Sequence, residues 1–349
     1  MHKQPIIMDA HSNKRRRSRA SDRALCWKVM IALAVGVMAC ETKALTEEQV
    51  ARAVDIASAV DGARLMNHVQ SLAQVRAADE GEDPPWGEEL PLLRERSRAY
   101  ILDTFRAMGL EPVEEIETLN QMESANIYVD IPGVVSPEEL VIISAHYDSW
   151  HIGADDNASG VSVLLEAARV LMEASPPACT IRLLAFDREE EGLIGSRRYV
   201  DAHRDDHVVV VINLDAVAYS DSEPGSQLSL PGIELPDTGN FLAAVGAGKS
   251  VDFLAQLAAL SKRLPQPVFV VGLSAPGDSR YPVIGNLLRS DHAWFWSTDV
   301  PALFLTDTAD FRNPNYHTAR DLPATLDYDF FSRVAALTIG AAAAFAGVP

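Results

Sequence analysis

Side chains that can bind a metal ion or transfer a proton stand after the apolar segments of this sequence. They are His146 and Asp148 after segment 140–145, Glu189 and Glu190 after 180–186, Asp215 after 208–214, and His317 beyond 302–306. A loop at 153–160 adds the adjacent carboxylates Asp155 and Asp156. Imidazoles and carboxylates are ligands of divalent metals, and carboxylates also act as general bases. These residue types therefore predict metal-dependent or acid–base chemistry wherever the fold brings them together.

The segments that must position these residues alternate between strands and helices. Apolar runs predict strands at 126–131, 140–145, 180–186, 207–214, 268–272 and 302–306. Helical spacing predicts helices at 46–75, 90–108, 160–172, 253–264 and 328–345, the first with a capping box of Thr46 and Gln49. This alternation predicts an α/β fold, a three-layer sandwich with a mostly parallel central sheet flanked by helices. Segment 221–249, rich in Gly, Pro and Ser, is expected to leave the sheet.

The position of the polar residues after strands is more informative than any single motif. Ligands of open α/β sheets bind outside the carboxyl ends of the strands. Taken alone, a His-x-Asp pair is typical of a surface contact, adjacent Glu residues are usually solvated, and an Asp-Asp-Asn run often forms a turn and helix cap. Their joint occurrence on loops that follow strands favours one shared site.

The motifs HYDS (146–149), GADDNASG (153–160), EEEGLIGS (189–196), NLD (213–215), SDH (290–292) and YHTARD (316–321) together resemble those of the M28 zinc peptidases. That family includes leucyl-type aminopeptidases and glutamate carboxypeptidases, and the resemblance spans roughly residues 45–345. It implies the zinc-exopeptidase version of the sandwich fold and a hydrolase that removes residues from the ends of peptides.

Carried over residue by residue, the resemblance implies two zinc ions per chain. His146 and Asp215 would bind one ion, Glu190 and His317 would bind the other, and Asp156 would bridge the two. This arrangement would leave each ion with an open position, as a catalytic zinc requires.

The same resemblance assigns roles around the metals. Glu189 would be the general base for a metal-bridged water that attacks the peptide carbonyl, and Asp148 would hold the His146 imidazole. Asp291, His292 and Arg289 would lie on the substrate side. Aminopeptidases of the family often have a Tyr three residues before the SDH serine, where this chain has Leu287. Arg289, Asn286, Tyr281 or the metals alone are the alternatives for stabilising the oxyanion, and segment 277–288 is expected to shape the substrate pocket.

Three further activities remain open beside the favoured aminopeptidase. A carboxypeptidase would need arginine for the terminal carboxylate, and Arg289 and Arg312 are candidates, although Arg312 equally suits a structural pair with Asp310 or Asp307. A glutaminyl cyclase would use one zinc, and a non-catalytic binding homologue would use none. Residues 1–28 contribute +6 to the formal charge of −19, so the remaining residues carry −25, which favours the cationic end of a peptide substrate.

The first forty residues have the pattern of an export signal. Basic residues 1–28 precede the uncharged apolar run 29–39, which is shorter than the roughly 20 residues of a membrane-spanning helix. Val37-Met38-Ala39-Cys40 resembles a bacterial lipobox, which implies an exported lipoprotein on the periplasmic or cell-surface side, anchored through Cys40. An ordinary signal peptide cleaved nearby is the alternative.

The composition limits the other partners. The acidic remainder of the chain argues against nucleic-acid binding and leaves the lipid as the expected contact with a membrane. Cys179 is the one cysteine after Cys40, so no internal disulfide and no disulfide-linked partner is expected. We expect a signal peptide at 1–39, an N-terminal helical segment at 40–89 and a peptidase domain at 90–349.

Overall fold

The computed structural model describes residues 44–77, 90–119, 122–229, 233–275 and 282–349. The predictions about the signal peptide, Cys40, the break after residue 77 and Tyr281 lie outside these residues, and the division at residue 89 remains a prediction. The described residues all belong to one compact unit. No helix within the described ranges is long and apolar enough to span a membrane.

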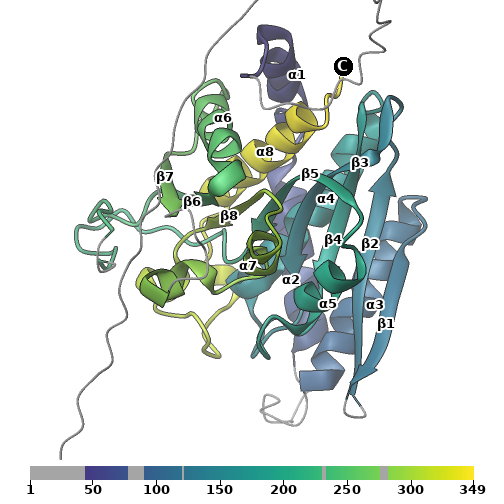
Figure 1. The fold of residues 1–349 in the computed structure, drawn as a ribbon. Helices are drawn as coiled ribbons and strands as arrows, with labels where there is room; N and C mark the ends of the chain where they lie inside the picture. Colours follow the sequence, from purple (N-terminus) through teal and green to yellow (C-terminus); the bar gives the residue numbers. More distant parts are fainter. Residues whose placement is uncertain (1–43, 78–89, 120–121, 230–232, 276–281) are drawn as a thin grey trace, which may run out of the picture. The chain divides into compact units, whose positions relative to one another are not determined.

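A single mixed sheet organises the described residues (Figure 1). Its strands are β1 (Val113–Leu119), β2 (Met122–Ile131), β3 (Ser136–His146), β4 (Cys179–Phe186), β5 (His207–Leu214), β6 (Leu242–Ala247), β7 (Val270–Ala275) and β8 (Ala302–Thr306). They lie in the order β1-β2-β4-β3-β5-β8-β6-β7. The pairs β3–β4, β3–β5, β5–β8 and β6–β7 are parallel, and the other neighbours are antiparallel.

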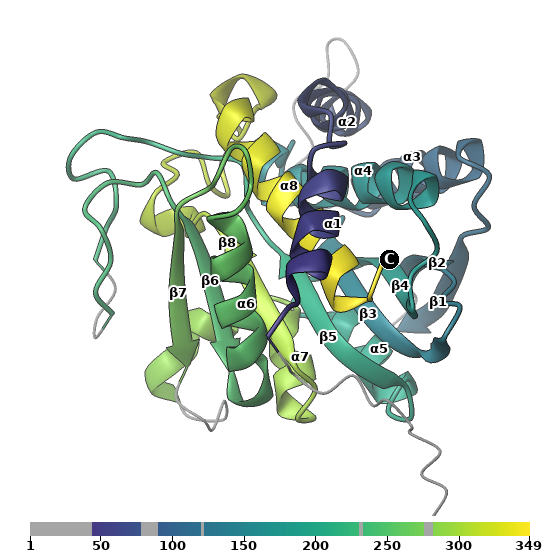
Figure 2. The same cartoon turned by 90° about the horizontal axis from the view of Figure 1, so that it is seen from above.

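Helices cover both faces of this sheet and complete the predicted three-layer sandwich (Figure 2). One face carries α1 (Glu47–Ala57), α2 (Gly62–Arg76), α3 (Leu90–Ala107), α4 (Gly160–Glu173), α6 (Val251–Ser261) and α8 (Tyr328–Phe345). The other face carries α5 (Ile194–Ala202) and α7 (His292–Ser297).

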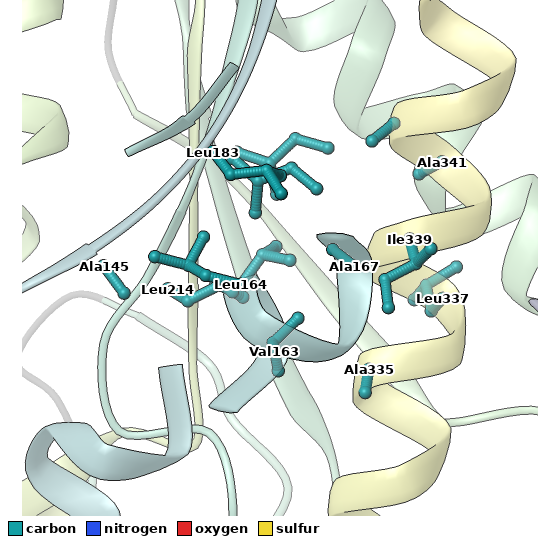
Figure 3. Close-up of a cluster of buried hydrophobic side chains, with 14 of the residues drawn as sticks. Ala145, Val163, Leu164, Ala167, Leu183, Leu214, Ala335, Leu337, Ile339 and Ala341 are labelled. Atoms are coloured by element: carbon teal, nitrogen blue, oxygen red, sulfur yellow. The ribbon is translucent and has the colours of Figure 1, made fainter. Parts of the chain in front are cut away.

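The alternation of side chains along the strands builds one hydrophobic core on each face. In β4, Leu183 points to the core shared with α4 and α8 (Figure 3), and its neighbour Leu184 points to the core under α5 and α7. Each fully buried aliphatic side chain contributes about 1.5–3 kcal/mol of burial free energy, so both layers hold the central strands firmly.

The local predictions succeeded where the hydrophobic pattern was strong. The capping box of Thr46 and Gln49 is confirmed at the start of α1. The expected helix 46–75 is two helices, because Asp61 and Gly62 break it and the Asp61 side chain caps α2. The expectation that 221–249 leaves the sheet is wrong for its last part, since residues 242–247 form the fully buried strand β6.

Four parallel strands place the candidate residues at one edge. β4, β3, β5 and β8 are adjacent and run in the same direction, so their carboxyl ends meet. His146 ends β3, Asp215 follows β5, and Glu189 lies in the loop after β4. The predicted convergence of these side chains is therefore built into the strand order.

Candidate metal centre

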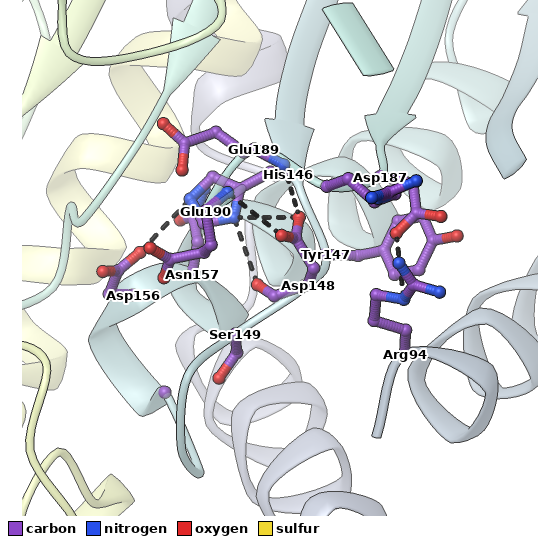
Figure 4. A network of polar contacts seen from close by, with 12 residues as sticks. Arg94, His146, Tyr147, Asp148, Ser149, Asp156, Asn157, Asp187, Glu189 and Glu190 are labelled. Carbon is purple, nitrogen blue, oxygen red and sulfur yellow. Dashed lines mark hydrogen bonds and ion pairs between the residues drawn. The ribbon is translucent and has the colours of Figure 1, made fainter. Parts of the chain in front are cut away.

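His146 is fixed at the end of β3 with one ring nitrogen turned toward the carboxylate of Asp156 (Figure 4). Its Nδ1 lies 3.1 Å from the backbone carbonyl oxygen of Asp148, so Nδ1–H donates there. Its Nε2 lies 3.2 Å from Asp156 Oδ1 and 3.5 Å from Asp215 Oδ1. A donor bond from Nδ1 leaves the Nε2 lone pair free for a metal ion.

The loop that carries Asp156 is held by its neighbours on both sides. Gly153 adopts a positive φ of 56°, and a side chain there would collide with the Asp156 carbonyl oxygen. The Asp156 backbone N–H donates to Asp321 Oδ2 at 3.1 Å. Asn157 Nδ2 donates to the Leu214 carbonyl at 2.9 Å, and its Oδ1 accepts from the Gly160 amide at 3.0 Å. These bonds fix the direction of the Asp156 carboxylate.

A second group of ligands shares Asp156 with the first. His317 Nε2 lies 3.0 Å from Asp156 Oδ2 and 3.1 Å from Glu190 Oε2. The two sets that could hold an ion are therefore His146 with Asp156 and Asp215, and Asp156 with Glu190 and His317. Asp156 faces each group with a different oxygen, as a bridging carboxylate does.

The donor atoms fit a pair of zinc ions. Ligands about 2.0–2.1 Å from a tetrahedral zinc ion are separated from one another by about 3.3 Å, close to the distances in both groups. His146 Nε2, Asp156 Oδ1 and Glu190 Oε1 are buried and have no hydrogen-bond partner within the described structure. Buried polar atoms normally have a partner, and three carboxylates with two imidazoles form a donor set that zinc accepts.

The electrostatics of the two groups also call for a cation. Burial disfavours the charged imidazoles, yet the surrounding carboxylates raise the pKa of His146 well above its usual range and that of His317 to about 10. Burial and the neighbouring Asp156 raise the pKa of Glu190 to about 8. Positive charge is thus strongly favoured at this position, and a divalent cation would supply it in place of the protons.

Asp148 positions the loop of the expected base more directly than it positions His146. Its Oδ1 and Oδ2 accept the backbone N–H groups of Glu189 and Glu190, at 3.0 and 3.1 Å. Its Oδ1 lies 3.6 Å from His146 Nδ1, which donates instead to the Asp148 backbone. Glu189 is itself buried, and burial raises the pKa of this carboxyl well above its usual range.

A largely apolar pocket opens beside the first ligand group. It is lined by Asp215, Tyr316 and Arg289 together with apolar residues, among them Leu235, Val245, Leu273, Leu287, Phe304 and Phe311. Arg289 Nη1 is bound to both oxygens of Asp310, at 3.0 and 3.2 Å. Arg289 thus lies where the resemblance implies, but it is already engaged by a carboxylate.

Three other candidate residues lie beneath the surface. His292 is fully buried, stacks on Phe304 and donates from Nε2 to the Leu287 carbonyl at 2.7 Å, so it supports the pocket wall rather than lining it. Asp291 is also fully buried, and burial raises its pKa to about 7. Arg312 donates hydrogen bonds to Gln227 and to the Phe241 carbonyl. Its role is therefore structural, but its hydrogen-bond partners differ from the expected Asp310 or Asp307.

Three residues of the site were missed from the sequence. Tyr316 lines the pocket and stacks on His317 with ring centroids 3.9 Å apart. Asp321 anchors the Asp156 loop, and Arg76 donates to the backbone on both sides of the loop between His146 and Asp156. Tyr316 and Asp321 belong to the YHTARD motif, which was a usable signal, whereas nothing in the sequence around Arg76 indicates its partners.

Comparison with known proteins shows which family the chain resembles. The model of peptidase family M28 matches residues 126–342. The uncharacterized protein YfbL of Escherichia coli is 33% identical over 256 residues, which cover 68% of this chain and 76% of YfbL. A probable zinc metalloprotease of Pyricularia oryzae is 28% identical over 64% of this chain and 50% of its own length. Aminopeptidase YwaD of Bacillus subtilis is 45% identical over 84 residues, which are 24% of this chain and 18% of YwaD.

Solved structures share the fold at lower sequence identity. An aminopeptidase from Aneurinibacillus has a TM-score of 0.62 at 17% identity and covers 85% of this chain and 96% of its own. A glutaminyl cyclase from Porphyromonas gingivalis has a TM-score of 0.58 at 16% identity, over 81% and 98% of the two chains. The match to the family model, supported by the similarity to YfbL, shows that the chain belongs to peptidase family M28.

Proposed function

We propose that this M28 peptidase is a two-zinc exopeptidase that removes residues from the amino terminus of peptides. The observation that carries the proposal is that Asp156 belongs to two ligand groups at once. Each group contains one imidazole and one further carboxylate. One carboxylate between two such groups is the arrangement expected of a pair of metal ions about 3.5–4 Å apart.

The residues of the chain supply the remaining chemistry. When bound, the zinc pair would acidify water and polarise the scissile carbonyl. Glu189 would take the proton of the attacking water and deliver it to the leaving amine, for which its raised pKa is suitable. Burial and the nearby carboxylates also raise the pKa of Tyr316, so its hydroxyl stays protonated and can donate to the oxyanion, in place of the tyrosine that Leu287 replaces.

The charges beside the pocket favour the amino end of a substrate. A carboxypeptidase needs an arginine for the terminal carboxylate, but Arg289 is bound to Asp310 and Arg312 is buried among other partners. Glu189 instead offers a carboxylate beside the metals that belongs to neither ligand group, which suits an α-ammonium group. The similarity to YwaD, an aminopeptidase, supports the same choice.

The test uses one tripeptide in free, N-acetylated and C-amidated forms, with zinc counted per chain. An aminopeptidase should cleave the free and the C-amidated tripeptides but not the N-acetylated one. The protein should also bind two zinc ions per chain. The opposite cleavage pattern would make the protein a carboxypeptidase and Arg289→Ala the next variant. One zinc ion with cyclisation of amino-terminal glutamine would favour a glutaminyl cyclase, and no zinc would favour a binding protein.

A further inference from the structure

A buried arginine from the amino-terminal helices reaches the backbone beside the metal centre. Arg76 is the last residue of α2, and only 1% of it is exposed. Its Nη2 donates to the Tyr147 carbonyl at 2.8 Å, and its Nη1 donates to the carbonyls of Ile152 and Gly153 at 3.0 and 2.9 Å. All three acceptors are uncharged, so this is not an ordinary ion pair.

These acceptors stand at the two ends of one short loop. Tyr147 immediately follows His146, and Gly153 lies three residues before Asp156. The segment between them determines how far the first imidazole lies from the bridging carboxylate. A planar guanidinium has donors in a fixed fork, so one side chain can hold both ends of the loop at a set separation. The fourth bond, from Nε to Ser97 Oγ at 2.9 Å, ties the same group to α3.

The charge of Arg76 acts on the same carboxylates. Burial lowers its pKa to about 10, while attraction to Asp148, Asp156, Asp321 and Glu190 opposes that decrease. The side chain therefore remains a cation at neutral pH. Carboxylates gathered at one buried site repel one another, and a fixed cation behind them reduces that repulsion without occupying a ligand position.

We infer that Arg76 is a positioning residue of the metal centre, which holds the loop 147–153 so that His146 and Asp156 lie at ligand distance. The inference rests on the proposed two-zinc function and gives α2 a role in supporting the metal centre, whereas the sequence suggested only a helical segment that packs on the peptidase domain. It also explains why a buried side chain here carries a charge, although a hydrophobic residue of similar volume would avoid the cost of desolvation.

The experiment compares Arg76→Met, which fills similar space without donors, and Arg76→Lys, which keeps the charge but lacks the fork. Arg182→Met is the matched control, because Arg182 is another buried arginine and its partners are Asp130 and Tyr199 rather than the metal loops. Each full-length protein is stripped of metal, and its zinc affinity is measured by competition with a coloured chelator. Thermal unfolding and the kcat and KM for a free tripeptide are measured in parallel.

We expect Arg76→Met to weaken zinc binding by about 10- to 100-fold, the usual effect of removing a group that orients metal ligands, and to lower kcat more than it raises KM. Arg76→Lys should recover part of the affinity. Arg182→Met should unfold at a lower temperature but bind zinc as tightly as the wild type. A folded Arg76→Met protein with wild-type zinc affinity and kcat would overturn the inference.

If Arg76→Met does not fold, Arg76→Lys decides the question, and unchanged zinc affinity and kcat in that variant would contradict the positioning role. Failure of the proposed function gives a different result, because the wild-type protein itself would then bind no zinc pair or leave the tripeptide intact.

Discussion

Two charge clusters lie on the same sheet, one partly exposed and one largely buried, and they differ in how their polar atoms are satisfied. In the first, Arg182 donates to both oxygens of Asp130 at 2.8 Å, and the two ring nitrogens of His203 lie 2.6 Å from Glu115 and 3.0 Å from Asp206. We call this the Arg182–His203 network. In the second, the metal centre, His146 Nε2, Asp156 Oδ1 and Glu190 Oε1 have no hydrogen-bond partner among the described residues.

The difference shows how a structural cluster can be told from a functional one. The Arg182–His203 network contains its own countercharges, so it needs nothing from solution. The metal centre collects carboxylates and imidazoles with ligand atoms turned toward a common point, and such a group is costly unless a cation joins it. A cluster of paired charges is present in both places, and the deeper burial and the unsatisfied atoms of the metal centre separate it from the network.

Removing the metal should have the largest effect, because only one of the two clusters is expected to bind zinc. Stripping zinc with a strong chelator should abolish peptide cleavage, and zinc should restore it. Zinc at about 100 times its dissociation constant should stabilise the stripped protein by about 2.7 kcal/mol, because it binds the folded state. Calorimetry with and without zinc measures this gain. An active metal-free protein, or a melting temperature indifferent to zinc, would remove the distinction between the two clusters.

Replacing Glu189, the expected general base, should lower kcat without changing the zinc content. Glu189→Gln should lower kcat by about 10²- to 10⁴-fold, the range for loss of a general base, and keep both zinc ions, because Glu189 belongs to neither ligand group. Glu191→Gln is the control, since Glu191 pairs with Arg188 and Arg94. Zinc content by elemental analysis, together with steady-state rates, measures the separation. A Glu189→Gln protein with wild-type kcat would exclude this role.

Replacing Tyr316, which stacks on His317, should have a smaller effect on kcat than replacing Glu189. Tyr316→Phe should lower kcat by about 100-fold, because it removes one donor to the oxyanion and leaves the ring stacked on His317. Tyr328→Phe is the control, as its hydroxyl donates to the Pro323 carbonyl in another part of the fold. Equal kcat values for the two variants would exclude Tyr316 as the donor to the oxyanion.

The smallest effect belongs to the Arg182–His203 network and appears as a pH dependence of stability. The hydrogen bond to Glu115, with Asp206 nearby, raises the pKa of His203 above its usual value. The protonated ring therefore stabilises the fold fully below about pH 6.5, and this contribution is lost as the pH rises through the raised pKa. Chemical denaturation should find wild type more stable than His203→Gln at pH 6, with a smaller difference at pH 9. A constant difference would show that the charge of His203 contributes nothing.

Sequence patterns predicted the parts of the molecule that depend on local periodicity and on residue type. β5, β8 and α8 begin and end at the predicted residues, because each is a strongly apolar run with a clear boundary. β1 was missed because its charged sequence and exposed Val113 and Ile116 lack a buried face, as an edge strand permits.

The supporting residues of the site depend on contacts between distant segments. Arg76 donates to a carbonyl 77 residues further along the chain, and the Asp155 backbone donates to Asp321 across 166 residues. Such partners are determined by how the helices pack on the sheet, and neither periodicity nor spacing along the chain encodes that packing. His292 shows the same limit, since its motif predicted a substrate contact and packing against Phe304 made it part of the core.

The strand order has a consequence for when the two candidate ligand groups are completed during synthesis. Residues of the first ligand group are complete once the ribosome has added Asp215, whereas the second group also needs His317, more than a hundred residues later. β8, which places the His317 loop, inserts between β5 and β6 and so joins the sheet after both of its neighbours have been made. A nascent chain can therefore present the three residues of the first ligand group before it can present the second, and the proposed zinc pair could form only after His317 has been added.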